Sequence, residues 1–183
     1  MRKISIILIP YLFLISCDLK PVTLAELKDY VQNPNNGLTQ SIQLGQVELS
    51  VQYKPSELMA AVDIIRSKAL ASDSIIQYYK QFTYLLISIG SDNVYVDAIL
   101  NQKIQDFTSK IDQSVNFNNQ SLIDYHVIDN YAIAGSTDIL LVYNYIKEKE
   151  NLELDIDTSV LGYGVQSFIF FGKQIENIPP LII

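Results

Sequence analysis

The sequence predicts an α+β domain in which N-terminal helices pack on an antiparallel, β-sandwich-like C-terminal portion. Two observations favour this class. The second half of the chain contains short segments rich in β-branched and aromatic residues, separated by turn residues at roughly ten-residue intervals, as in sandwiches. The first half instead repeats apolar residues at helical spacing. The predicted C-terminal strands are 121–133, 139–146, 152–156 and 165–171.

A capping box begins the first predicted helix. Thr23 is followed three residues later by Glu26, so the threonine hydroxyl can accept a backbone N–H while the glutamate reaches back. This helix is expected to continue to Gln32 and to end in the turn-forming cluster 33–37. Alternating apolar and polar residues over 44–53 then predict a half-buried strand.

Further periodic segments complete the first half of the chain. A second helix is expected after Pro55, and Ser74 is expected to cap a short third helix. The continuous apolar run 82–89 predicts a buried strand, and 97–111 predicts another helix. The apolar faces of the two longer helices are expected to carry Leu58, Val62, Ile65 and Ala69, and Leu100, Ile104, Phe107 and Ile111.

Residues 1–16 have the features of an export signal. Arg2 and Lys3 precede an apolar stretch that is shorter than the ~20 residues needed to span a bilayer. The stretch ends in Leu14-Ile15-Ser16-Cys17, which resembles the lipobox of bacterial lipoproteins. That resemblance implies a diacylglycerol on the Cys17 thiol and cleavage just before it. The alternatives are an ordinary signal peptide with an unrelated cysteine and an uncleaved membrane anchor.

The lipoprotein resemblance also divides the chain and locates it. Residues 17–22 become a short tether, and 23–183 a single α+β domain held against a bacterial envelope membrane. The Asn-, Ile-, Tyr- and Lys-rich composition resembles that of proteins from Bacteroidota. We expect the outer membrane, facing the periplasm. The inner membrane is the alternative location, because an aspartate directly after the cysteine, here Asp18, favours retention there in enterobacteria.

The residues that could carry chemistry are few. His126 is the only histidine, and the chain has no Gly-x-Ser-x-Gly elbow or His-Glu-x-x-His motif, so no catalytic residue and no cofactor are expected. Glu153, Asp155 and Asp157 alternate with apolar residues and therefore share one strand face. A calcium site is their functional interpretation. A solvated face is the interpretation that the regular strand spacing favours, so no metal is expected.

Two further features concern the surface. Asp73-Ser74-Ile75 resembles the O-glycosylation signal of exported Bacteroidota proteins, which would place a glycan on Ser74; the alternative is a helix cap. Most of the tyrosines are expected in the core, Tyr78, Tyr79 and Tyr131 being the least certain. The apolar segment 179–183 requires burial against its own domain or another subunit.

Charge and cysteine content limit the function. The formal charge of −7 becomes two units more negative when Arg2 and Lys3 are removed, which argues against nucleic-acid binding. Cys17 is the only cysteine, so disulfides within the chain are excluded. We therefore expect a non-enzymatic accessory subunit that binds another envelope protein. The type VI secretion outer-membrane lipoprotein resembles this chain in size, anchor and expected sandwich. A small-ligand or glycan-binding module is the alternative.

Overall fold

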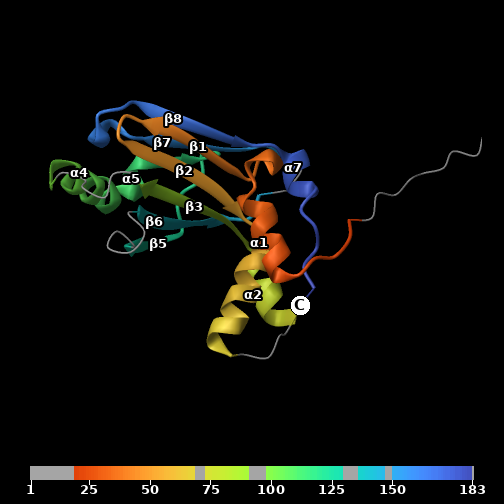
Figure 1. The fold of residues 1–183 in the computed structure, drawn as a ribbon. Helices are drawn as coiled ribbons and strands as arrows, with labels where there is room; N and C mark the ends of the chain where they lie inside the picture. The colour runs from red at the N-terminus through yellow and green to blue at the C-terminus, as the bar shows by residue number, and fades with distance from the viewer. Residues whose placement is uncertain (1–18, 69–72, 91–97, 130–135, 147–149, 183) are drawn as a thin grey trace, which may run out of the picture.

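The computed structural model describes residues 19–68, 73–90, 98–129, 136–146 and 150–182. Within these residues the named strands pair antiparallel in two sheets, and helices lie at both ends of the pair (Figure 1). The α+β class and the sandwich-like arrangement are therefore confirmed. The predicted signal peptide and Cys17 fall outside the described residues.

The larger sheet has five strands in the order β1-β2-β3-β6-β5, so that β1 and β5 form its edges. Three of these strands come from the first half of the chain, which extends the sandwich beyond the predicted C-terminal portion. Their bounds are β1 (Thr39–Leu44), β2 (Val47–Lys54), β3 (Phe82–Gly90), β5 (Asp124–Asp129) and β6 (Ser136–Asn144).

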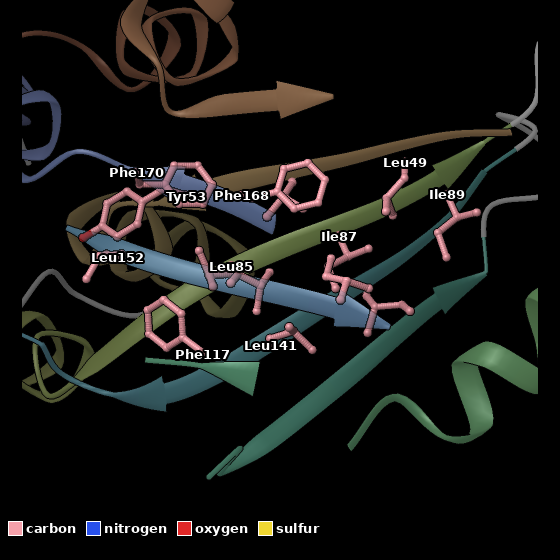
Figure 2. Packing of buried hydrophobic residues seen from close by; sticks show 14 of the residues in the cluster. Leu49, Tyr53, Leu85, Ile87, Ile89, Phe117, Leu141, Leu152, Phe168 and Phe170 are labelled. Atoms are coloured by element: carbon pink, nitrogen blue, oxygen red, sulfur yellow. The ribbon is translucent and has the colours of Figure 1, made fainter. Parts of the chain in front are cut away.

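The smaller sheet has three strands in the order β4-β7-β8 and covers part of the larger one. Its strands are β4 (Val115–Phe117), β7 (Leu152–Asp157) and β8 (Val165–Phe170). Figure 2 shows side chains of both sheets meeting in one apolar layer. The rings of Phe117 and Tyr143 lie 4.6 Å apart between centroids, and those of Tyr53 and Phe170 lie 6.4 Å apart. These contacts hold the two sheets together.

Helices cover the ends of the sandwich. In α1 the predicted capping box is present, and Leu27 and Val31 are buried in the core. The predicted helix 97–111 is present as two helices, with Ile104, Phe107 and Ile111 fully buried. The helical bounds are α1 (Leu24–Gln32), η1 (Pro34–Asn36), α2 (Ser56–Ser67), α3 (Asp73–Tyr79), α4 (Ala98–Ser109), α5 (Ile111–Ser114), η2 (Ser159–Leu161) and α7 (Gly172–Glu176).

The predicted apolar face of α2 is wrong in part. Leu58 is buried, but Val62 and Ile65 are exposed, and the helix instead buries Ala60 and Ala61. The face of α2 that is covered by the rest of the domain therefore includes Leu58 and Ala61 and not Val62 or Ile65. Ala69 lies outside the described residues.

The predicted strand 44–53 is confirmed as β2 from Val47 onward, whereas its first residue, Leu44, belongs to β1, which a tight turn joins to β2. Gly45 has a positive φ of 60°, a conformation that other L-residues rarely adopt. A Cβ atom at Gly45 would also collide with the Tyr163 hydroxyl. Leu44 therefore ends β1, and Val47 begins β2. The polar composition of β1 is the reason that it was not predicted.

Tyr143 supplies a test of core packing. Its side chain is fully buried, and its hydroxyl has no hydrogen-bond partner among the described residues. Replacing Tyr143 by phenylalanine is expected to raise the free energy of unfolding by about 1 kcal/mol, because an unpaired buried hydroxyl is removed without loss of volume.

Tyr30→Phe is the matched control in a urea denaturation series. The Tyr30 hydroxyl donates to the Asn177 carbonyl oxygen at 3.1 Å, so this change is expected to lower the unfolding free energy by about 1 kcal/mol. A loss of stability in Tyr143→Phe as large as that in Tyr30→Phe would show that the Tyr143 hydroxyl is hydrogen-bonded after all.

Candidate functional site: an exposed sheet edge and a polar hollow

Strand β5 is an edge strand with exposed apolar side chains. It pairs with β6 alone among the described strands, which leaves its outer edge without a partner strand there. Tyr125 and Val127 pair with the buried residues Leu141 and Ile139 and therefore lie on the core side of the sheet. They are nevertheless 37% and 43% exposed, because the smaller sheet does not cover them. Ile123 and Ile128 are also exposed.

The opposite edge of the same sheet differs from β5. Strand β1 is mostly polar, and Gln40 donates from Nε2 to the Ile169 carbonyl oxygen of β8 at 2.6 Å. This contact ties the β1 edge to the smaller sheet. An apolar, exposed edge strand invites pairing with another chain, and proteins normally protect such edges with charges or covering segments. Within the described residues, the β1 edge has such a contact with the smaller sheet, and no comparable contact is seen at the β5 edge.

His126 lies on the outer side of β5, facing solvent. Its Nε2 is 3.7 Å from Asp124 Oδ2, and both side chains are well exposed. An exposed pair of this kind contributes at most about 1 kcal/mol to stability. Within the described residues no group of three or more His, Cys, Asp or Glu residues is placed to hold a metal ion. The absence of catalysis stays a prediction.

The three carboxylates of β7 lie on its outward face, as their alternation predicted. Glu153 and Asp157 are exposed, while Asp155 accepts a hydrogen bond from the Ser167 hydroxyl at 2.5 Å. Asp157 accepts from the Ser159 hydroxyl and backbone N–H at 2.5 and 2.9 Å, and these bonds hold its pKa below the usual value. Asp155 and Asp157 therefore pair with serines on neighbouring segments, as on a solvated face.

A polar hollow of about 390 Å³ lies beside Glu153 and Asp155. Its lining is rich in amides, which sequence reasoning missed because they come from separate segments: Asn116, Asn118, Asn119 and Asn151. Two of these amides are structural. Asn118 Oδ1 accepts from the Glu153 N–H at 2.6 Å, and Asn151 Oδ1 accepts from the Gly172 N–H at 3.2 Å. Asn116 and Asn119 are exposed at its rim.

The remaining predicted surface residues lie on or near α3. Ser74 is exposed and lies inside the first turn of α3, which begins at Asp73, so it does not cap this helix as predicted; its glycosylation stays a prediction. Tyr78 is exposed. Tyr79 is half-buried, and burial together with its hydrogen bond to Asp63 raises its pKa to about 12. Tyr131 lies outside the described residues.

The first and last described segments lie at the opposite end of the sandwich from α4 (Figure 1). Burial was predicted for the apolar segment 179–183, and the structure shows it in part. Leu181 is half-buried against its own domain, whereas Ile182 is exposed. In the described part of the chain, no helix has the length and apolar character required to cross a membrane.

Comparison with known proteins found one distant structural similarity. No protein-family model and no curated protein matches the chain. A crystal structure of a DUF4426 family protein from Pseudomonas aeruginosa PAO1 aligns with 73% of this chain and 91% of that chain, at 12% identity and a TM-score of 0.37. A TM-score this low carries no argument about fold or function.

Proposed function

We propose that this protein is a lipid-anchored accessory subunit of the bacterial envelope that binds another envelope protein through its β5 edge. Acylated Cys17 is its attachment to the membrane, with the outer membrane, facing the periplasm, as the proposed location. A subunit of a secretion machine fits this role. The single observation that supports protein binding is the exposed apolar edge strand β5.

An edge strand offers two kinds of interaction at once. Its outward N–H and C=O groups can form a new ladder with an extended segment of a partner, which supplies affinity. Its exposed side chains then select the partner. On β5 these are Tyr125 and Val127 on the core side and Ile128 on the other. A partner strand added here would continue the larger sheet and cover side chains that the smaller sheet leaves exposed.

Val127→Lys is expected to abolish partner capture while the domain stays folded. A lysine on an edge strand opposes strand addition, because pairing would desolvate its charge. The measurement is crosslinking in cells, followed by purification from solubilised membranes and comparison of the captured proteins with those of the wild type. Circular dichroism checks the fold.

Ile42→Lys is the matched control. Ile42 is an apolar residue of similar exposure on β1, the opposite edge of the same sheet, so the change adds the same charge at comparable depth. Capture is expected to survive it. Equal capture by Val127→Lys and the wild type would remove β5 as the docking edge.

A small-ligand or glycan-binding module is the second candidate. The observation that favours it is the polar hollow, whose exposed amides and carboxylates could hydrogen-bond to hydroxyl groups. Wild-type protein that captures no partner but binds a glycan, with binding lost in Asn116→Ala, would replace the docking proposal by this one.

A further inference from the structure

The first and last described segments of the chain are joined by hydrogen bonds. The Val22 N–H donates to the Pro180 carbonyl oxygen at 2.9 Å, and the Ile182 N–H donates to the Val22 carbonyl oxygen at 2.9 Å. Val22 and Leu181 thus form a short parallel bridge, and both pack against the apolar core. We call residues 19–22 and 179–182 together the terminal clasp. Figure 1 shows both segments on the same side of the molecule.

The clasp exposes apolar side chains at its outer surface. Ile182 is 62% exposed and Leu19 is 39% exposed, while Pro21 and Pro180 are exposed between them. Lys20 is also exposed here. Apolar residues next to a lysine are typical of surfaces that rest in the interfacial region of a membrane, where the apolar groups enter and the ammonium group reaches the headgroups.

The short distance in sequence between Cys17 and the terminal clasp favours a membrane as the partner of this surface. Val22 is the fifth residue after Cys17, so even a fully extended tether spans at most about 18 Å. Acyl chains on Cys17 would therefore hold the clasp within that distance of the lipid headgroups. The headgroup region is itself several ångströms thick, about 5–8 Å on each side of the hydrocarbon. A membrane-facing position of the clasp is within reach without any unfolding.

We propose that the terminal clasp seats on the bilayer that holds the anchor, with Ile182 and Leu19 in the headgroup region. This inference rests on the proposed lipid anchor and adds a defined orientation to it. The clasp fixes the end of the sandwich that carries α1 and α7 toward the lipid and directs the end with α4 away from it (Figure 1). The partner is the lipid surface, recognised through apolar contact rather than through the β5 edge.

Site-directed fluorescence in vesicles tests this orientation. Because Cys17 is the only cysteine and its thiol is acylated in the lipidated protein, I182C introduces a unique reactive thiol. The labelled lipoprotein is reconstituted into vesicles of phosphatidylethanolamine and phosphatidylglycerol with brominated lipid as quencher. We expect a blue-shifted emission and a marked loss of fluorescence at position 182.

I99C is the matched control. Ile99 is an isoleucine of similar exposure on α4, at the opposite end of the molecule, and its label is expected to keep the emission of an aqueous probe. Equal emission and quenching at both positions, in protein that floats with the vesicles, would overturn the clasp proposal and leave the anchor standing. Protein that does not float with the vesicles would overturn the anchor and the clasp together.

Discussion

Cys17→Ser is expected to remove lipid labelling completely and to move the protein out of the membrane fraction or leave it as unprocessed precursor. A serine hydroxyl does not replace the thiol that receives the diacylglycerol in the lipoproteins that residues 14–17 resemble. The effect is large because each buried methylene contributes about 0.8 kcal/mol and stable attachment requires more than one chain. Incorporation of a labelled fatty acid and detergent phase partitioning measure it.

Ser16→Ala is the control for this experiment. It changes the neighbouring residue but keeps a small side chain there, so labelling and membrane attachment are expected to persist. Continued lipid labelling of Cys17→Ser would refute the lipoprotein assignment. The clasp and the short tether would then lose their physical link to a membrane, whereas the β5 edge would keep its role as a candidate docking surface.

Phe117→Ala is expected to lower the free energy of unfolding by about 3–5 kcal/mol. Phe117, labelled in Figure 2, is fully buried on β4. The centroid of its ring lies 4.6 Å from that of Tyr143 in the larger sheet. Removing the ring leaves a cavity between the two sheets that the paired strands on both sides prevent from collapsing. A loss of this size is a large share of the stability of an ordinary domain.

Urea denaturation of the purified protein measures this loss, with Phe171→Ala as the matched control. Phe171 follows β8 and is 52% exposed, so its removal is expected to change the unfolding free energy by only about 0.5 kcal/mol. Similar losses in the two variants would contradict the arrangement in which β4 covers the larger sheet.

Local signals predicted the elements that depend on nearby residues. The Thr23–Glu26 capping box acts within one helical turn and defined the start of α1 correctly. The apolar run of β3 and the alternation of β7 also predicted strands, because a strand buried on one or both faces shows this in its own sequence. β1 was missed because its polar side chains carry no such signal.

Properties that depend on distant residues were not predictable in the same way. The sequence indicated a strand around β5, but its position at the edge follows from the order in which five segments pair. Val62 and Ile65 were expected in the core, but α2 buries Leu58, Ala60 and Ala61 instead, and which side of a helix is covered depends on segments distant in the sequence. The polar hollow combines amides from β4 and the turn after it with Asn151, which precedes β7, and no local pattern connects these segments.

The Val22–Leu181 bridge also determines how the domain responds to mechanical tension. In a protein anchored at Cys17, a force that pulls the domain away from its membrane acts first on residues 19–22, ahead of α1 and of either sheet. The two hydrogen bonds of the bridge each contribute only about 1 kcal/mol net, so they yield before the sandwich does. When these bonds break, the tether between Cys17 and α1 becomes longer by a few residues, while the two sheets stay folded. If Cys17 carries the proposed anchor, the bridge would therefore open under tension before the folded domain does.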